Sequence, residues 1–237
     1  MIGGRVMMAG VCTVVVRWAA GLPTRILALR DESTSRPFDD PDRWWPEYPD
    51  VVGGRDRTAG GTWCANRVST GVTAMVVNRA PKRVADPGAP SRGVVPLLAA
   101  AHEEAWTDHL DVAGMASFAL VLATPGRLTV WEYDGAALTS TELAAGTHMV
   151  TSGGAEDGKA DHYLRRFDRA EFPAGWRAIV EAETPHDDPA SLVVRHETEA
   201  FVYATVFGQL IEAEPGRVSI EHSRTPWLAG SWQRSPG

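Results

Sequence analysis

The chain has 237 residues, of which 44% are hydrophobic and 22% charged, with a formal net charge of -7 and an isoelectric point near 5.5. This is the composition of a globular protein rather than of a disordered chain or a membrane protein, and we expect a single domain. Nucleic acid is not an expected partner, because binding to phosphates requires a basic surface.

The N-terminal run Val6–Val16 is mostly apolar and follows Arg5, as in a secretory signal. It has only one basic residue, however, and no apolar span of about 18 residues, so we expect a buried β-strand and no integral membrane segment. The two cysteines, Cys12 and Cys64, exclude a scaffold of several disulfides and favour reduced thiols in a cytoplasmic protein. The 21 arginines against two lysines indicate a GC-rich coding genome.

Runs of β-branched and aromatic residues predict two pairs of strands in the first third of the chain. These strands are Thr13–Trp18, Arg25–Leu29, Thr62–Arg67 and Val72–Asn78. Between the pairs, Ser33–Gly54 is rich in Pro, Asp and Trp without a sustained period. We expect a long irregular excursion there, able to cover a site.

A first helix is predicted at Val94–Leu110, where apolar and acidic residues lie on opposite sides. Later strands are predicted at Met115–Ala123, Leu128–Tyr133, Phe201–Ala213 and Arg217–His222, and helices at Asp161–Ala170 and Gly175–Glu181. Alternating runs of strands and helices favour the α+β class over a doubly wound sheet. Two sheets between layers of helices would accommodate this order, with the helix near Leu97–Trp106 on an outer face.

Two segments carry a resemblance to a known family. The first runs from Cys12 to Leu29-Arg30-Asp31-Glu32 and resembles the NRDE family, or transport and Golgi organization protein family, in which a near-terminal Cys is followed by Asn-Arg-Asp-Glu; Leu29 replaces the Asn. The second, Gly54–Trp63, is similar to the family's Gly-Arg-Asp followed by Gly-Gly-Thr-Trp and is the most specific signal. Weaker similarities follow at Val77-Asn78-Arg79 and Tyr203-Ala204-Thr205.

NRDE proteins in turn resemble N-terminal-nucleophile hydrolases of the penicillin acylase and bile-salt hydrolase type, so the resemblance implies a four-layer αββα sandwich over residues 12–237. It also implies a thiol nucleophile on Cys12 with that residue's own α-amine as general base. Arg30 would then favour the thiolate, Asp31 would hold the amine and Asn78 would stabilise the oxyanion. The candidate substrate-binding residues are Arg55, Asp56, Thr62 and Trp63. We expect no cofactor and no metal.

In an N-terminal-nucleophile hydrolase the nucleophile must be the first residue of the mature chain, yet eleven residues precede Cys12. Autoproteolysis after Val11 is one route. Another is initiation at Val11 through a GUG codon, followed by removal of the initiating methionine. We expect residues 1–11 to be an upstream extension or a misassigned start, and the mature protein to begin at Cys12.

Each candidate also has a structural interpretation. A lone Cys in a valine-rich strand is most often a small buried hydrophobe, and Arg30-Asp31 and Gly54-Arg55-Asp56 could brace the fold by ion pairs and hydrogen bonds. Aromatic residues could line an apolar ligand pocket, although packing is the more frequent role. The residues in question are Trp44, Trp45, Tyr48 and Trp63. The histidines His148, His196 and His222 lack metal-ligand spacing, and Cys64 is expected to pack.

Two functions are consistent with these observations. The first is a cysteine amidohydrolase that cleaves a carbon–nitrogen bond in a small molecule. The second, implied by the resemblance to eukaryotic relatives, is a non-catalytic binding or trafficking protein for haem, lipid or acyl-CoA. The amidohydrolase requires Cys12, Arg30, Asp31 and Asn78 to converge at one sheet edge, and it requires the α-amine of an N-terminal Cys12.

Overall fold

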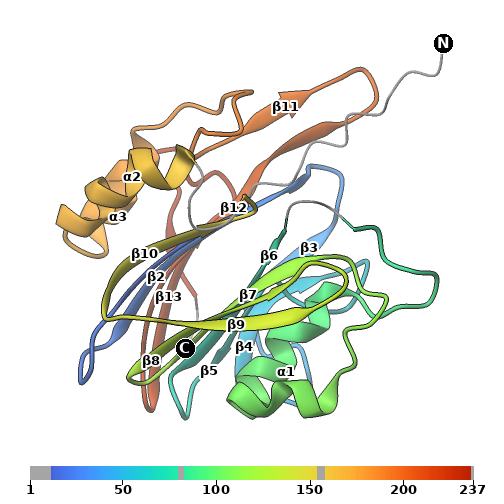
Figure 1. The fold of residues 1–237 in the computed structure, drawn as a ribbon. Helices are drawn as coiled ribbons and strands as arrows, with labels where there is room; N and C mark the ends of the chain where they lie inside the picture. The colour runs from blue at the N-terminus through green and yellow to red at the C-terminus, as the bar shows by residue number, and fades with distance from the viewer. Residues whose placement is uncertain (1–11, 80–82, 154–157, 236–237) are drawn as a thin grey trace.

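The protein has an α+β fold in which every pairing between named strands is antiparallel (Figure 1). The computed structural model describes residues 12–79, 83–153 and 158–235. Within these residues the strands form two sheets of seven strands each. The beginning of the apolar run at Val6 lies outside the described residues.

The first sheet has the strand order β10-β1-β2-β12-β13-β14, with β11 also paired to β12. Its strands are β1 (Thr13–Trp18), β2 (Thr24–Ser33), β10 (Gly146–Thr151), β11 (Arg195–Glu197), β12 (Val202–Glu214), β13 (Arg217–Ser223) and β14 (Gln233–Arg234). The long strand β12 pairs with β2 along its length, and the register shifts at a bulge between Thr205 and Phe207.

The second sheet has the order β3-β4-β5-β6-β7-β8-β9, which is also the order of the strands along the chain. Its strands are β3 (Phe38–Asp42), β4 (Val51–Asp56), β5 (Cys64–Arg67), β6 (Val72–Asn78), β7 (Phe118–Thr124), β8 (Arg127–Tyr133) and β9 (Leu138–Leu143). This meander places the two strands of each sequence-adjacent pair side by side.

Helices lie on opposite sides of the two sheets (Figure 1). Those beside the second sheet are the short 3-10 helix η1 (Arg92–Val94), α1 (Val95–His102) and the 3-10 helix η2 (Glu103–His109). Those beside the first sheet are α2 (Gly158–Arg169) and α3 (Ala174–Glu181). Three hydrophobic clusters fill the spaces between sheet and sheet and between each sheet and its helices.

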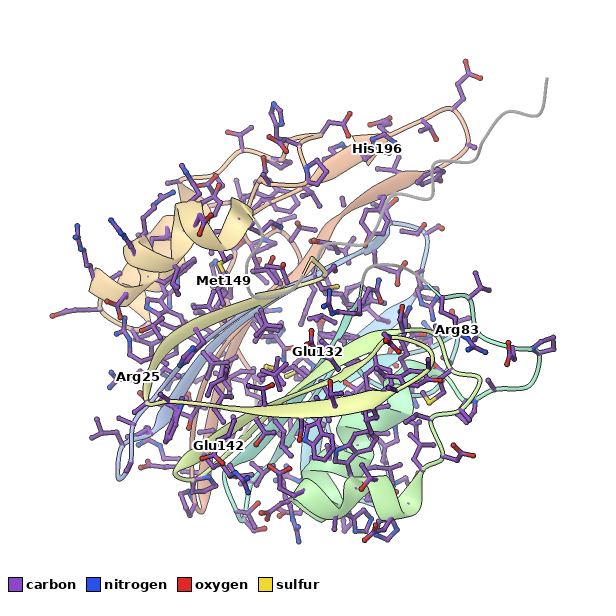
Figure 2. All side chains as sticks on the ribbon, viewed as in Figure 1. Arg25, Arg83, Glu132, Glu142, Met149 and His196 are labelled. Carbon is purple, nitrogen blue, oxygen red and sulfur yellow. The ribbon has the colours of Figure 1, made fainter. Side chains whose placement is uncertain are left out.

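The side-chain alternation of the central strands accounts for these three clusters. In β7, Ala119 and Val121 face the first sheet, whereas Leu120 and Leu122 face α1. The strand β2 alternates in the same way, and Met149 of β10 lies in the cluster with α2 and α3 (Figure 2). Because both faces of these strands are covered, their sequences are almost continuously apolar.

The predicted strand pairs and the helices in the α2–α3 region are confirmed, but Ser33–Gly54 is not irregular as expected. It contains all of β3 and the first part of β4, which form one edge of the second sheet. Pro41 is tolerated in β3 because an edge strand need not donate every backbone hydrogen bond. In β4, a Cβ at Gly54 would lie 2.4 Å from the Trp63 ring, so close packing explains a glycine in this strand.

The prediction of one continuous helix over Val94–Leu110 is wrong, because the segment is broken into three short helices. The helix α1 ends at His102, Glu103 adopts a φ of 54°, and the chain continues as a 3-10 helix. After this break, Trp106 is fully buried against Phe118 and Trp131. The short strands β9, β10, β11 and β14 were not predicted, and β2 continues past Leu29 through Ser33.

Candidate active site

A cavity of about 100 Å³ opens where β2, β4 and β6 end and β1 begins. Because Thr13 pairs with Leu29 across β1 and β2, the residues next along each strand, Cys12 and Arg30, come together at this edge. The cavity is lined by Cys12, Arg30, Asp31, Glu32, Arg36, Asp56, Ala59, Thr62, Trp63, Val76, Asn78, Ser91, Arg92 and Gly93.

The thiol of Cys12 is half-buried, and it donates a hydrogen bond to the backbone carbonyl oxygen of Asp31 at 3.7 Å. Burial and the negative charge of Asp31 raise the pKa of this thiol to about 11, although the nearby Arg30 opposes the increase. With Cys12 inside the chain, the sulfur is therefore protonated at neutral pH and is a weak nucleophile.

The carboxyl group of Asp31 is 3% exposed and is held by β12. The Thr205 hydroxyl donates to its Oδ1 atom at 2.6 Å, and the Tyr203 hydroxyl donates to its backbone carbonyl oxygen at 2.7 Å. Its Oδ2 atom has no hydrogen-bond partner in the described part of the chain. Burial raises the pKa of Asp31 to about 7, against the opposing effects of Lys159, Thr205 and Arg30.

The guanidinium group of Arg30 is 5% exposed and lies over the rings of Trp63 and Phe38, 4.5 and 5.2 Å from their centroids. Its Nη2 atom contacts Asp56 at 3.3 Å and Glu32 at 3.5 Å. Its Nη1 atom is buried and has no hydrogen-bond partner among the described residues. The side chain is thus fixed by aromatic and acidic neighbours while one of its donor atoms remains unused.

Asp56 connects the Gly-Arg-Asp motif to this cavity. Its Oδ1 atom accepts the backbone N–H groups of Thr58 and Ala59, and its Oδ2 atom accepts a hydrogen bond from Arg36 at 2.6 Å. Burial alone would raise the pKa of Asp56, but the hydrogen bonds from Arg36 and the backbone hold it below its usual value. Asp56 is therefore an ionised brace for Arg30 and Arg36.

The remaining predicted residues differ in what their side chains contact. Thr62 donates to the carbonyl oxygen of Cys64 at 2.8 Å, so its hydroxyl is used within the fold. Asn78 lines the cavity, and its side-chain amide forms no hydrogen bond with the described residues. Arg55 does not line the cavity, because it pairs with Asp39 at 2.7 Å and lies over the Trp44 ring.

The structure therefore brings most of the predicted site residues to one cavity but leaves Arg55 outside. Those at the cavity are Cys12, Arg30, Asp31, Asp56, Thr62, Trp63 and Asn78. Of the four aromatic residues considered as pocket lining, only Trp63 reaches it, whereas Trp44, Trp45 and Tyr48 pack in the cluster beneath α1.

Six contributors were not assigned a role from the sequence: Glu32, Arg36, Arg92, Lys159, Tyr203 and Thr205. The last two belong to the Tyr-Ala-Thr segment that carried a weak resemblance, which was the available signal for them. Lys159 is 1% exposed and donates to the Thr13 hydroxyl at 3.2 Å. Its only signal in the sequence was that the chain has just two lysines. No sequence feature distinguished Arg36 or Arg92 from the other arginines.

The described residues contain no group of three or more His, Cys, Asp and Glu side chains arranged to hold a metal ion. Cys64 is fully buried between the sheets, as its expected packing role requires. Among the helices described, none is long and apolar enough to cross a membrane.

The residues that line this cavity all lie within the segment that a known protein family matches. The family model described as Transport and Golgi organisation 2 matches residues 12–171, which is more than half of the chain and begins at Cys12. No curated protein shows a significant match to the chain. From the extent of the family match, the chain belongs to the Transport and Golgi organisation 2 family.

Proposed function

We propose that this protein is a cysteine amidohydrolase of the N-terminal-nucleophile type, which acts on a carbon–nitrogen bond of a small molecule when Cys12 is N-terminal. The observation that carries the proposal is the Cys12 thiol beside a buried Asp31 carboxyl whose Oδ2 atom has no described partner. An unsatisfied buried carboxylate oxygen is costly, and the α-ammonium group of an N-terminal Cys12 is a cation suited to satisfy it.

The α-amine would also convert the thiol of Cys12 to the reactive thiolate. An α-amino group has a pKa of about 8, close to neutral pH, and can therefore accept the thiol proton. The resulting ammonium would be held by Asp31, while Arg30 and the ammonium charge stabilise the thiolate. The same contacts leave the thiol largely protonated when Cys12 is inside the chain.

The reaction then proceeds in two steps. The sulfur attacks the amide carbonyl carbon, the carbonyl oxygen gains negative charge, and Asn78 donates a hydrogen bond to that oxygen. The α-ammonium gives its proton to the leaving nitrogen, the carbon–nitrogen bond breaks, and a thioester remains on Cys12. Water, deprotonated by the α-amine, attacks the thioester carbonyl carbon and releases a carboxylic acid and the free thiol.

The cavity volume limits what part of a substrate can enter. A site that encloses a whole drug-sized ligand has about 300 to 1,000 Å³, whereas this cavity has about 100 Å³. We infer that a short acyl group, or the end of a longer one, enters beside Cys12 and that the rest of the substrate lies outside.

The fold and the start of the family match support the same proposal. Helices flanking two packed antiparallel sheets are the arrangement expected of a four-layer N-terminal-nucleophile hydrolase domain, here over residues 12–237. Cys12 is also the first residue that the family model matches. We infer that residues 1–11 are removed, or are not translated, in the mature cytoplasmic protein.

A second cavity supports the alternative of a non-catalytic carrier for haem, lipid or acyl-CoA. It has about 430 Å³ and lies between the edges of the two sheets, with Glu132 on β8 and Met149 on β10 among its lining residues (Figure 2). Leu143, Val150 and Leu164 supply apolar surface. Its volume is within the range of small-molecule sites, so a carrier would bind here rather than at Cys12.

Hydrolysis of a panel of small N-acyl amides tests the proposal. Protein that begins at Cys12 should release amine from at least one member, and Cys12→Ala should release none. Asn78→Ala should lower kcat by about 100-fold, as expected for loss of one oxyanion donor, while leaving thiol alkylation unchanged. Equal amine release by the Cys12→Ala variant would overturn the proposal, and ligand binding at the second cavity without hydrolysis would favour the carrier.

A further inference from the structure

One cation of the candidate active site has no role in the mechanism above. Arg92 lines the cavity from η1, and its Nη1 atom donates to the backbone carbonyl oxygen of Ser117 at 3.0 Å. Its other N–H groups make no hydrogen bond with the described residues, and no described carboxylate forms an ion pair with it. Burial lowers the pKa of Arg92, but a guanidinium group remains charged in proteins.

The acidic residues at the cavity are committed to other cations. Asp56 pairs with Arg36 and Arg30, and Glu32 contacts the same two arginines at 3.7 and 3.5 Å. Four cations, those of Arg30, Arg36, Arg92 and Lys159, therefore face three acidic residues, Glu32, Asp56 and Asp31, and Asp31 interacts with both Lys159 and Arg30. The group has one positive charge in excess.

A second arginine that lines the cavity also has a donor without a described partner. The Nη1 atom of Arg30 has no described partner, although the side chain is 95% buried. Buried donors without partners are rare because their desolvation is not offset. The Arg30 guanidinium cannot turn freely to find one, since it is stacked on Trp63 and paired with Asp56.

We propose that the cavity recognises a carboxylate on the substrate, close to the bond that Cys12 attacks, through the N–H groups of Arg92 that lack a described partner and the positive charge of Arg30. Arginine suits this role because its planar group matches a carboxylate and retains its charge when partly buried. A neutral substrate of the same shape would leave the charge of Arg92 without a counter-ion. The inference names the substrate class of the proposed amidohydrolase, but the recognition itself does not require hydrolysis.

A structural role for Arg92 is the competing explanation. A tether between η1 and Ser117 would use the hydrogen bond from Nη1, which a neutral donor such as Gln could retain. The two explanations differ in charge: only anion recognition predicts that the reaction of Cys12 depends on the charge of its partner.

Alkylation of Cys12 by iodoacetate and by iodoacetamide separates these explanations. In both reactions the sulfur of the thiolate attacks the CH₂ carbon, the carbon–iodine bond breaks, iodide leaves and the thiol proton passes to buffer. The reagents differ in carrying a carboxylate or a neutral amide. The ratio of their rate constants is independent of the thiolate fraction, so it can be measured on the 237-residue chain at pH 8.5 by mass spectrometry.

We expect the iodoacetate-to-iodoacetamide ratio for Cys12 to be at least about tenfold higher than for the neutral thiol N-acetylcysteinamide in the same buffer, as a charge-assisted hydrogen bond implies. Arg92→Gln should lower the Cys12 ratio by about tenfold, and Arg92→Lys should lower it less. Arg217→Gln is the matched control, because Arg217 is an exposed arginine at the far end of β13 and should leave the ratio unchanged.

A ratio for Cys12 equal to that of N-acetylcysteinamide would overturn the proposal, as would an unchanged ratio in a folded Arg92→Gln variant. If Arg92→Gln does not fold, the wild-type chain provides the test: succinate should slow alkylation by iodoacetamide and succinamide should not. Equal effects of the two compounds would contradict carboxylate recognition. A high ratio without any amide hydrolysis would support recognition while rejecting the proposed reaction.

Discussion

The two cysteines of this protein lie in the same pair of sheets but in opposite chemical surroundings. Cys64 is fully buried between the sheets, and burial raises its pKa to about 12, opposed only by a hydrogen bond from Asn66. Cys12 also has a raised pKa, yet it lies at a cavity beside Arg30, Asp31 and Glu32. Burial raises the pKa of both thiols. Only Cys12 lies beside charged side chains that could hold an α-ammonium group, which would then lower the pKa of its thiol.

The largest expected difference is in thiol labelling. Iodoacetamide at pH 8.5 should modify Cys12 in the native protein and leave Cys64 unmodified, because Cys64 is not accessible. Cys12→Ala should abolish labelling, and Cys64→Ala should preserve it while lowering the free energy of unfolding by about 1 kcal/mol. Peptide mapping of labelled protein checks this, and equal labelling in wild type and Cys12→Ala would remove the distinction between the cysteines.

The next effect concerns Asp31 and pH. Its pKa is about 7 in the folded chain with Cys12 internal and about 3.9 when unfolded, so the folded state alone retains the proton between these values. The protonated Asp31 carboxyl therefore contributes its full stabilisation of the folded state below about pH 4, and this stabilisation is lost as pH rises to about 7. Relative to wild type, Asp31→Asn should therefore gain up to about 4 kcal/mol in free energy of unfolding over this range.

Urea unfolding of both proteins at several pH values measures that gain. Asp161→Asn is the matched control, since Asp161 is an exposed residue of α2 and should show no such pH-dependent difference. Parallel stability curves for wild type and Asp31→Asn would mean that Asp31 ionises normally, and the special environment assigned to Cys12 would lose one of its main components.

A smaller effect is expected from Arg30→Lys. Lysine keeps the charge but cannot stack on Trp63 and contact Asp56 and Glu32 with a planar group, so we expect Cys12 labelling to slow by up to about tenfold. Arg25→Lys, on the same strand and in a partly exposed pair with Glu212, should not change the rate. Equal rates for the two variants would show that Arg30 affects the thiol only through its charge.

Much of the fold was predictable wherever the residues of a single strand or helix carry its characteristic pattern. The strands β1, β6, β8 and β13 follow from β-branched and aromatic runs, and α2 and α3 from helical periodicity. The strands β3 and β4 were missed because Pro41 and the pair Gly53-Gly54 lower strand propensity. The two glycines are instead explained by the close approach of Trp63 and Cys64, which a pattern within the strand does not show. Tertiary packing thus overrides local preference at this sheet edge.

Parts of the candidate site were predictable because they lie in short sequence motifs or in one hairpin. Arg30-Asp31 and Asn78 belong to segments similar to family motifs, and the antiparallel pairing of β1 with β2 brings Cys12 beside Arg30. The contacts of Thr205 and Tyr203 with Asp31 depend on the pairing of β2 with β12, about 170 residues apart. Arg55 shows where a motif misleads. Its place in the Gly-Arg-Asp motif predicted that it binds substrate, but its side chain pairs with Asp39 outside the cavity.

The pH dependence of Cys12 alkylation in two forms of the protein, one with residues 1–11 and one beginning at Cys12, tests most directly whether Cys12 acts as an N-terminal nucleophile. In the longer form, the rate of reaction with iodoacetamide should rise with an apparent pKa near 11. In the form beginning at Cys12, the α-ammonium beside Asp31 should move the apparent pKa close to neutral pH. The same high apparent pKa in both forms would contradict the proposal that Cys12 becomes a nucleophile when it is N-terminal.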